Sequence, residues 1–395
     1  MRRSTDPLLH ALLAALEREL EPACELRRRL HGDPELAHAE RRTARIVAEA
    51  LPVASDVVAG TGRIARVGPS TGAPIALRAE LDGLAVRERT GASFSARGET
   101  MHACGHDVHM AALVALARAA DRLGAQLPVA LLAVFQPSEE IYPSGAEQLA
   151  RGELAGFAPA AVLGAHVHPE LPWGAVALDA GAVNASSDSA EIVIEGEPSH
   201  GAYPHRGRDP ILALAQVVVA LHAQAARRID PTHAALVNVG VLEAGATENV
   251  IPSRARARAS LRAFAPGDRE ALRELVVEVV AGTAAAHGCR GTVELIAGEP
   301  ALENDARIVA SARALLGDAA FVAAPPWRSC GSDDFAFFGE LAPLAMAFVG
   351  LDGAPAFRSR PLHHPELLPP EESVGAVARA QAVLYVAAIE ALSLY

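Results

Sequence analysis

The sequence predicts an α/β protein with a mainly parallel sheet, helices on both faces of that sheet, and an inserted ferredoxin-like α+β domain. Three observations predict this fold class. Continuous apolar runs at 127–135 and 160–165 are typical of strands buried on both faces. Helical patterns alternate with these runs, which indicates parallel strands joined by crossover helices. From residue 186 to residue 299 the pattern changes to strictly alternating strands in the order βαββαβ.

The length of 395 residues is too great for one compact core and predicts two domains. We expect the larger domain to comprise residues 1–182 and 300–395, because the α/β pattern stops near residue 181 and returns after residue 300. The smaller domain is then the insertion at residues 183–299. We find no internal repeat and no long linker.

The first part of the chain alternates helices and strands. Residues 8–31 predict a helix with Pro22 as a break or restart, and residues 40–51 predict a second helix. The strands expected next are 74–83, 127–135 and 160–170, and the helices between them follow the loop at 101–109 and cover 143–154. Ligands of such sheets bind outside the carboxyl ends of the strands, where this sequence places acids and histidines.

The rest of the chain is predicted to form the inserted domain and then, after residue 300, the last elements of the larger α/β domain. The insertion predicts strands within 186–199, 234–245, 253–266 and 291–299 and helices at 209–228 and 267–288, the second opened by Asp268. After residue 300 we expect a helix at 304–317, a turn into a helix capped by Ser332 at 331–341, a strand at 344–351, a loop at 361–370 and a closing helix at 371–392.

Net charge and cysteine content limit the classes of partner and the cellular compartment that we expect. The chain carries 35 Lys and Arg against 47 Asp and Glu, a net charge of −12, which argues against nucleic acid or an anionic membrane as a partner. We expect no stretch long enough to span a membrane, and the N-terminus is interpreted as an amphipathic helix instead of a signal peptide. Four widely spaced cysteines suit a reducing compartment. A cytoplasmic location is the expectation.

The segment MHACGHDVH at residues 101–109 holds three histidines, a cysteine and an aspartate. Gly105 separates Cys104 from His106 and lets the backbone turn sharply. Taken alone, Cys104 is most simply a buried thiol and His106 a loop histidine. Together in one loop that enters a helix, they predict metal ligation.

Glu139 and Glu140 directly follow a buried strand. A solvated turn is the usual place for two adjacent glutamates. Function becomes plausible if one carboxylate binds a metal while its neighbour acts as a general base. Two histidine pairs follow later in the chain, and one member of each would complete two neighbouring metal sites; the pairs are His166 with His168 and His363 with His364. Two metals together suit hydrolysis.

Glu80 and Asp82 end an earlier strand and share one of its faces. At that position both can reach the predicted site and orient its metal ligands. A capping or salt-bridge role is as plausible for either of them.

The motifs together resemble one family, the two-metal amidohydrolases of the aminoacylase and carboxypeptidase type. The branch most similar holds hippurate hydrolase, N-acyl-amino-acid amidohydrolases and auxin-conjugate hydrolases. The resemblance runs nearly end to end, and the metal loop is its most specific part. The motifs, in the family's order, are ELRRRLHGDPELAHAE, LRAELDGLAVRE, MHACGHDVHMA, QPSEE with SGAEQL, GAHVHPELPWG, GEPSHGAYPHRGRDPI, ENVIP, GSDDFAFF and LHHPEL.

The resemblance implies a role for each matching residue. Two divalent metal ions would be bound by Cys104, His106, Glu140, His166 and His363. Glu139 would be the general base and then the acid for the leaving amine. His200 of the smaller domain resembles a histidine that reaches a partner subunit's active site and stabilises the oxyanion, which implies a homodimer or a higher homo-oligomer. Asn249 and Arg262 resemble residues that hold the substrate's carboxylate or carbonyl. The smaller domain would therefore serve as a dimerisation and lid domain.

Two departures from the family pattern affect this assignment. The strand motif usually has Asp where this chain has Glu80, and Ala-Leu-Pro at positions 83–85 where this chain has Gly-Leu-Ala, whereas Asp82 matches. His364 stands where small residues are common, so His363 and His364 are alternative ligands. The metal is zinc, manganese, cobalt or nickel by ligand type.

The resulting hypothesis is a metal-dependent hydrolase that cleaves the amide bond of a hippurate-like N-acyl amino acid into a carboxylic acid and an amino acid. One alternative is the same chemistry in a metallo-exopeptidase. A second is a cysteine hydrolase with Cys104 as nucleophile. A third is a non-catalytic metal-binding or small-molecule-binding descendant of the fold, against which the intact Glu139–Glu140 pair argues.

Overall fold

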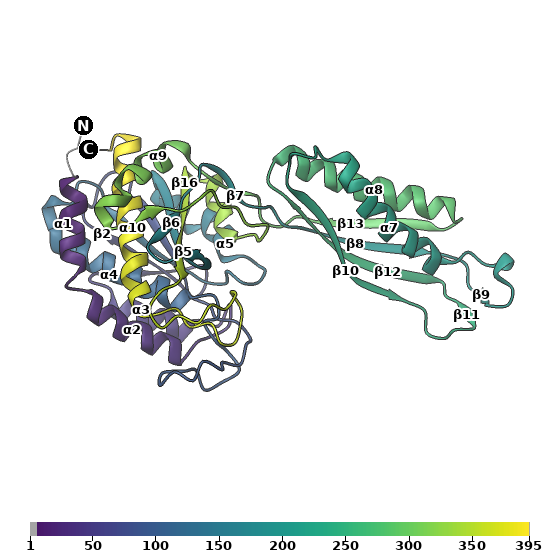
Figure 1. The fold of residues 1–395 in the computed structure, drawn as a ribbon, viewed down its shortest axis with the longest axis horizontal. Coiled ribbons are helices and arrows are strands. Elements are labelled where there is room, and N and C mark those ends of the chain that lie inside the picture. The colour runs from purple at the N-terminus through teal and green to yellow at the C-terminus, as the bar shows by residue number, and fades with distance from the viewer. Residues whose placement is uncertain (1–5, 395) are drawn as a thin grey trace. The chain divides into compact units, whose positions relative to one another are not determined.

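The computed structural model describes residues 6–394 and divides the chain into two compact units (Figure 1). The larger unit comprises the described residues up to Gly181, Glu303–Trp327 and the described residues from Asp334 onward. The smaller unit comprises Ala182–Leu302 and Arg328–Asp333. Residues 182, 300–302 and 328–333 were predicted from sequence to lie in the larger domain, whereas they belong to the smaller unit.

The larger unit is built on an eight-stranded sheet. The strand order is β1 (Asp56–Val58), β2 (Gly62–Val67), β4 (Leu131–Gln136), β3 (Ile75–Glu80), β5 (Ala161–Pro172), β16 (Leu344–Asp352), β6 (Ala175–Ala177) and β15 (Val322–Ala323). The four central strands, β4, β3, β5 and β16, are parallel, whereas β2 and β6 run antiparallel to their inner neighbours. The predicted mainly parallel sheet is confirmed, and the carboxyl ends of its central strands meet at one edge.

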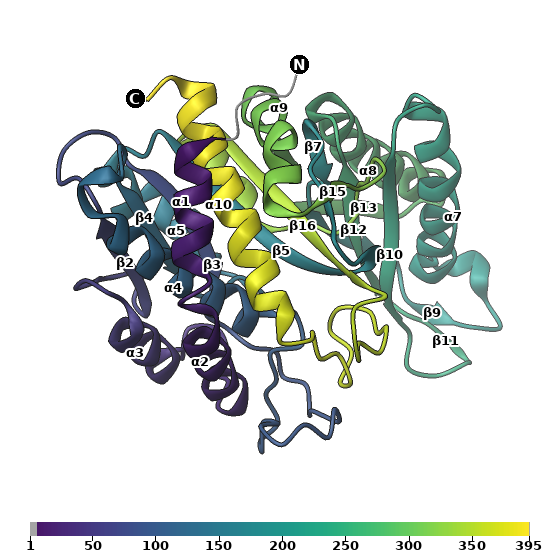
Figure 2. The ribbon, with the colours of Figure 1, turned by 60° about the vertical axis from the view of Figure 1, so that its left-hand side comes forward.

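Helices cover both faces of this sheet, as predicted. One face shares a core with α1 (Pro7–Leu16), α2 (Leu20–Gly32), α4 (His106–Leu123), α9 (Ala306–Leu315) and α10 (Glu372–Leu392), and Ala44 and Val47 of α3 (Arg41–Ala50) belong to the same core. Figure 2 shows α1 and α10 side by side over the strands. On the opposite face, the short 3-10 helix η4 (Asp334–Glu340) brings Phe335 against Gly164 of β5. Helix α5 (Gly145–Arg151) packs on η4. Shorter elements complete this unit: α6 (Glu153–Phe157), η1 (Gly124–Gln126) and η3 (Leu316–Ala319).

The parallel strands are apolar because neither face meets water. Every residue of β3 and of β4 is buried. The polar side chains on these strands, Arg78, Glu80 and Gln136, lie at or near the carboxyl ends and bond to one another. Burying such groups is tolerated only where partners satisfy them. The sheet therefore confines its polar chemistry to one edge.

The first helical stretch breaks at residues 17–19 and restarts as α2, and Pro22 lies in the first turn of α2 where its missing N–H is tolerated. Two local expectations were wrong. The segment expected as a helix capped by Ser332 forms the 3-10 helix η4, which begins at Asp334. Helix α8 begins at Pro266, so Asp268 lies in its first turn and does not open it.

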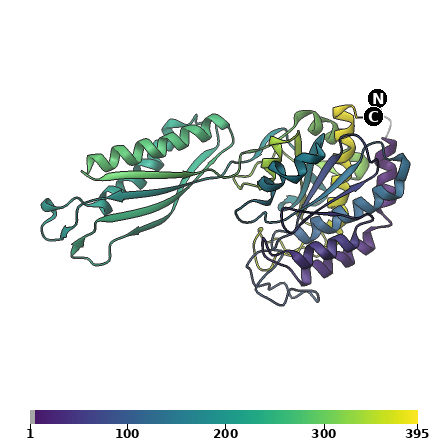
Figure 3. The same cartoon turned by 180° about the vertical axis from the view of Figure 1, so that it is seen from behind.

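The smaller unit has the predicted βαββαβ order and an antiparallel sheet with the order β10, β12, β8, β13. Its strands are β8 (Asp188–Glu195), β10 (Ala235–Ala244), β12 (Arg254–Ala263) and β13 (Arg290–Ile296). Helices α7 (Pro210–Arg228) and α8 (Pro266–Ala286) pack on one face of these strands (Figure 3). Shorter elements are β9 (Ser199–His200), which pairs with β11 (Val250–Ile251), and η2 (Pro204–Arg206). The chain passes between the units at β7 (Gly181–Asn184) and β14 (Leu302–Asn304).

Two helices, α7 and α10, are long and apolar enough to cross a membrane by length and composition alone, contrary to the expectation from sequence. Helix α10 is 83% buried over its apolar window, so packing in the core explains its composition. Helix α7 is only 28% buried over its window. It presents Ile211, Leu212 and Val219 as exposed apolar side chains.

Candidate metal centre

The centre begins where the loop at 101–105 enters α4. Gly105 has φ +88°, and an added Cβ would lie 2.6 Å from Cγ2 of Val167, so the turn requires glycine. His106 is the first residue of α4 and Cys104 precedes the turn. Donor atoms of Cys104, His106 and His166 all lie within 4.8 Å of one another. The loop and the end of β5 thus converge at the carboxyl edge of the sheet.

Three further groups of potential metal ligands share members with the first, and one of them joins His166 to Glu80 and His109. Cys104 groups with Glu140 and His363, and His106 groups with Glu139 and Glu140, each within the same 4.8 Å. The Nε2 atom of His363 lies 3.3 Å from Oε1 of Glu140. Nδ1 of the adjacent His364 instead accepts the backbone N–H of Glu366. Of the two alternatives left open by the sequence, His363 is the one whose ring reaches this centre.

The donors at the centre fit divalent metal ions. Nε2 of His106 and Oε1 of Glu140 are buried, and neither meets hydrogen-bond geometry with a partner among residues 6–394, although Nε2 of His363 lies 3.3 Å from that oxygen. The His106 and Glu140 atoms lie 3.9 Å apart, too far for a hydrogen bond between them. Orphaned buried polar atoms are costly, and a metal ion bound by both would satisfy them. Thiolate, imidazole and carboxylate together form a donor set that zinc and its neighbours accept.

The surroundings of Cys104 favour the protonated thiol over the thiolate. Burial raises the pKa of this thiol well above its usual value, and the charges of Glu140 and Glu139 raise it further. A cysteine nucleophile would need the thiolate at neutral pH, whereas these surroundings oppose it. A divalent cation would reverse this balance by binding the thiolate directly. The geometry therefore argues against the cysteine-hydrolase hypothesis.

The histidines at the centre differ in charge. Burial lowers the pKa of His166 well below its usual value, so its imidazole is neutral, as a metal ligand must be. Its Nδ1 lies 2.6 Å from the backbone carbonyl of Val167, which leaves Nε2 for a metal. Burial alone would also lower the pKa of His106, but Glu80, Asp82 and Glu140 raise it to about 10. In the absence of metal, a proton therefore neutralises part of the carboxylate charge around His106.

Asp82 contacts both His106 and the turn that carries Glu139 and Glu140. Its backbone carbonyl accepts the Nδ1–H of His106 at 2.8 Å. Its Oδ2 accepts the backbone N–H groups of Glu139 and Glu140, each at 3.0 Å. One residue therefore fixes the direction of His106 and the position of the turn that carries both glutamates. This is the orienting contact that the sequence analysis proposed for Asp82.

Glu80 contacts His109, and the ring of His109 in turn packs against that of His166. The backbone N–H of Val167 donates to Nε2 of His109 at 3.0 Å, so the proton of this ring is on Nδ1, which donates to Glu80 Oε2 at 2.8 Å. The ring of His109 packs 4.4 Å from that of His166. Burial would raise the pKa of Glu80, but Arg78 and His109 hold it well below its usual range. Glu80 is thus an ionised carboxylate that pairs with Arg78 and His109, and its donor atom also groups with those of His109 and His166.

The sequence analysis missed two supporting residues. It assigned no role to His109, although this residue is three positions after His106 on α4 and so lies on the same helix face. It also missed Arg78, which ion-pairs with Glu80 and with Asp334. Arg78 is two residues before Glu80 on β3, and the period of a strand predicts that they share a face.

A second missed network holds the start of α4. Arg27 and His31 of α2 both contact the carboxylate of Asp107, at 2.9 and 3.0 Å. His31 also lies 3.1 Å from Glu88. Burial would lower the pKa of His31, but Asp107 and Glu88 raise it to about 9. Because Asp107 follows His106 directly, this ion-paired cluster fixes the turn that presents His106.

The three candidates in the smaller unit are not part of the cluster formed by the larger unit. His200 is exposed on β9, and its Nδ1 accepts the backbone N–H of Ala202. Arg262 lies on β12 and donates to Ser332 Oγ at 3.1 Å. The side chain of Asn249 accepts the hydroxyl of Thr247. Their predicted roles toward substrate stay predictions.

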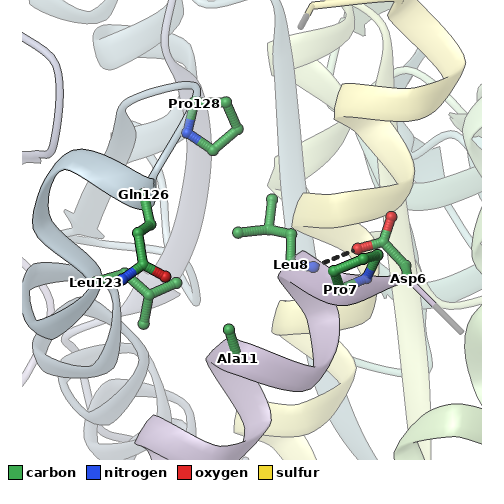
Figure 4. A pocket seen from close by; sticks show the side chains of 7 residues that line it. All are labelled: Asp6, Pro7, Leu8, Ala11, Leu123, Gln126 and Pro128. Atoms are coloured by element: carbon green, nitrogen blue, oxygen red, sulfur yellow. Dashed lines mark hydrogen bonds between the residues drawn. The ribbon is translucent and has the colours of Figure 1, made fainter.

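A separate recess of about 360 Å³ lies in the larger unit between the start of α1 and residues 123–128 (Figure 4). Among the described residues that line it, the one charged side chain is that of Asp6, whose carboxylate accepts the backbone N–H groups of Leu8 and Leu9 and so caps α1. The recess is mainly apolar and lacks the groups needed for acid–base or metal chemistry. The Cys104–His106 centre is therefore the candidate active site.

Comparison with known proteins agrees with this geometry. The profile of peptidase family M20/M25/M40 matches residues 76–385. N-acetyl-L-cysteine deacetylase of Bacillus subtilis is 33% identical over 359 residues, covering 89% of this chain and 84% of that protein. IAA-amino acid hydrolase ILR1-like 2 of Arabidopsis thaliana is 33% identical over 344 residues, covering 83% and 76%. A Bacillus subtilis crystal structure described as a dinuclear metal-binding peptidase of the M20 family superposes with a TM-score of 0.83 at 28% identity, covering 95% and 99%.

The site and fold together define a metal-dependent amidohydrolase with a dinuclear metal centre. This chain belongs to peptidase family M20/M25/M40. The resemblance drawn from the motifs is thereby confirmed.

Proposed function

We propose that this protein hydrolyses the amide bond of N-acyl amino acids, with hippurate-like conjugates as the expected substrates, and releases a carboxylic acid and an amino acid. One observation carries the proposal. Glu139 stands beside the metal donors, with Oε2 3.7 Å from Nε2 of His106, and is held there by the bond from its backbone N–H to Asp82. The relatives named above as deacetylase and amino acid hydrolase act on the same linkage.

In the proposed mechanism, Cys104, His106, Glu140, His166 and His363 would hold two divalent ions. When bound, such ions polarise a carbonyl and make a water molecule more acidic. Glu139 accepts the proton of the attacking water and then donates it to the leaving nitrogen. Zinc, manganese, cobalt and nickel all match the donor set.

The side chains behind the ligands keep this geometry fixed. Asp82 holds His106 and the backbone of the glutamate turn, so the carboxylate of Glu139 needs little reorganisation to reach the reacting water. Glu80 and His109 support the end of β5, which carries His166. In the smaller unit, His200 is proposed to stabilise the oxyanion, and Asn249 and Arg262 to hold the substrate's carboxylate or carbonyl.

The assembly proposed for this enzyme is a homodimer in the cytoplasm. The exposed apolar side chains of α7, Ile211, Leu212 and Val219, form a surface that a second copy of the chain would cover. The four cysteines, all within the described residues, form no disulfide, which suits a reducing compartment. Light scattering of wild type and Val219→Glu tests the dimer: we expect a dimer that the charge weakens, and a wild-type monomer would contradict it.

The decisive experiment is hydrolysis of a panel of N-acyl amino acids and dipeptides before and after metal removal. We expect activity on N-acyl amino acids to disappear with a chelator and to return when zinc, manganese, cobalt or nickel is added back. Activity that survives complete metal removal would contradict the mechanism. Hydrolysis confined to dipeptides would instead support the metallo-exopeptidase alternative, which the family name allows.

A further inference from the structure

Three aromatic rings cluster beside the metal donors of the larger unit. The ring of His168 lies 4.6 Å from that of Trp327 and 6.3 Å from that of Phe348, and Trp327 lies 4.4 Å from Phe348. All three interplanar angles are between 50° and 88°, the tilted or edge-to-face arrangement that aromatic side chains prefer. None of these residues has a role in the mechanism above.

Strand register places this cluster next to His166. His168 follows His166 by two residues on β5, so both side chains leave the same face of the strand. Phe348 of β16 is the register partner of His166 itself. Two residues along a strand span about 6.6 Å, so His168 lies one side-chain repeat along the strand from His166.

The position of Trp327 is not explained by packing in the hydrophobic core. It lies outside regular secondary structure after β15, and its backbone N–H donates to the carboxylate of Asp179 at 3.0 Å. Trp327 and His168 are half-buried, whereas Phe348 is buried beneath them. Aromatic residues make up only 4% of the chain, and the core around the parallel strands consists mainly of Leu, Val and Ala. A half-exposed tryptophan against two rings is therefore suited to contact a ligand.

We propose that Trp327 and His168, supported from beneath by the buried ring of Phe348, form the acyl-binding surface of this enzyme and favour planar aromatic acyl groups over small aliphatic ones. The inference rests on the proposed hydrolysis of N-acyl amino acids and names the residues that select the acyl group. A flat acyl ring gains edge-to-face and stacking contacts from these rings, whereas an acetyl group is too small to make them. Trp327 is then a specificity residue and takes no part in the proton transfers.

The test compares N-benzoylglycine with N-acetylglycine, which differ only in the acyl group. In metal-loaded Trp327→Ala we expect kcat/KM for N-benzoylglycine to fall about tenfold, mainly through KM, with N-acetylglycine changed less than about twofold. Trp327→Phe retains a ring and should keep most of the preference. The matched control is Trp173→Phe, because Trp173 packs against the core of the same unit and lies outside the aromatic cluster. Metal content and thermal unfolding establish that each variant is folded.

A binding measurement separates this inference from the proposed function. The chain has two tryptophans, so Trp173→Phe leaves Trp327 as the sole tryptophan fluorophore. We expect benzoate, but not acetate at the same concentration, to change its emission. An unchanged ratio of the two kcat/KM values in folded Trp327→Ala, or no response to benzoate, would overturn the inference while the hydrolase proposal stands. If wild type cleaves neither substrate, the hydrolase proposal fails, and the benzoate titration alone decides whether the aromatic surface exists.

Discussion

The sheets of the two units treat polar side chains in opposite ways. In the larger unit, β3 and β4 are buried along their whole length, and their charged or polar side chains gather near the carboxyl edge. In the smaller unit, β8 and β12 alternate between buried residues and more exposed ones, and most of the more exposed positions carry Glu on β8 or Arg on β12. A strand with two buried faces can hold charge only in a satisfied cluster, whereas an open face places no such limit. The buried sheet of the larger unit therefore suits a preorganised centre, whereas the open face of the smaller unit does not require one.

Glu139→Gln should have the largest effect. The amide keeps the size of the side chain but cannot accept or donate the proton. We expect kcat to fall about 10³-fold or more, since general acid–base catalysis contributes up to about 10⁴-fold. Metal content by mass spectrometry should equal that of wild type. A variant with more than about a tenth of wild-type activity would show that another group carries the proton.

His31→Gln should destabilise the larger unit more than any change on the open sheet face. Removing one member of a buried ion pair costs about 3–5 kcal/mol, because its partners stay buried and unpaired. The pKa of His31 is raised from 6.5 to about 9, so its contribution is fully present below pH 6.5 and is lost as the pH rises through 9. Its partner Glu88 has its pKa lowered from 4.5 to about 2 and contributes fully above pH 4.5.

The difference in unfolding free energy between wild type and His31→Gln should therefore be largest between pH 4.5 and 6.5 and should shrink toward pH 9. Urea denaturation at a series of pH values measures it. A difference that stays constant from pH 6 to pH 10 would mean that His31 acts through packing and not through its charge.

One substitution on a strand of each sheet compares the effect of a buried position with that of an exposed one. Leu77 of β3 is fully buried, so Leu77→Ala should lower the free energy of unfolding by about 3 kcal/mol. Glu294 lies on the exposed side of β13, and Glu294→Gln should change it by less than about 0.5 kcal/mol. Chemical denaturation of both variants gives the comparison. Similar losses would show that the two sheets are buried alike.

Glu80→Asp should have a moderate effect. Aspartate is one methylene shorter and would weaken the contact with Nδ1 of His109, now 2.8 Å long, and so the support behind His166. Loss of such a supporting contact typically lowers metal affinity about tenfold or more. Titration with a competing chelator measures this. An unchanged affinity would make Glu80 only the ion-pair partner of Arg78.

Sequence patterns predicted much of this molecule because they report burial. The continuous run at 127–135 and the alternation at 253–266 identified β4 and β12. A strand with two buried faces has a continuous apolar run, whereas a strand with one buried face alternates between apolar and polar residues. The turn Glu139–Glu140 was placed correctly after a strand end. Helix ends were less predictable, because Ser332 and Asp268 satisfy capping rules that the packing of η4 and α8 does not use.

Sequence alone could not rank residues whose role depends on contacts across the chain. His363 and His364 are chemically identical, and only the turn with φ +67° at His363 shows which ring meets Glu140. The link from Arg27 to Asp107 joins residues 80 positions apart. His109 was within reach of helical periodicity, but its partner Glu80 lies on another element. Such pairs follow from the fold and not from local pattern.

The most direct test of the account is the number of metal ions bound per chain, measured by native mass spectrometry after incubation with zinc. We predict two ions in wild type and fewer in Glu140→Gln, because Glu140 groups with both Cys104–His363 and His106. His364→Ala is the matched control and should still bind two. Wild type that binds no more than one ion, or Glu140→Gln that binds two as tightly as wild type, would contradict a dinuclear centre built from these residues.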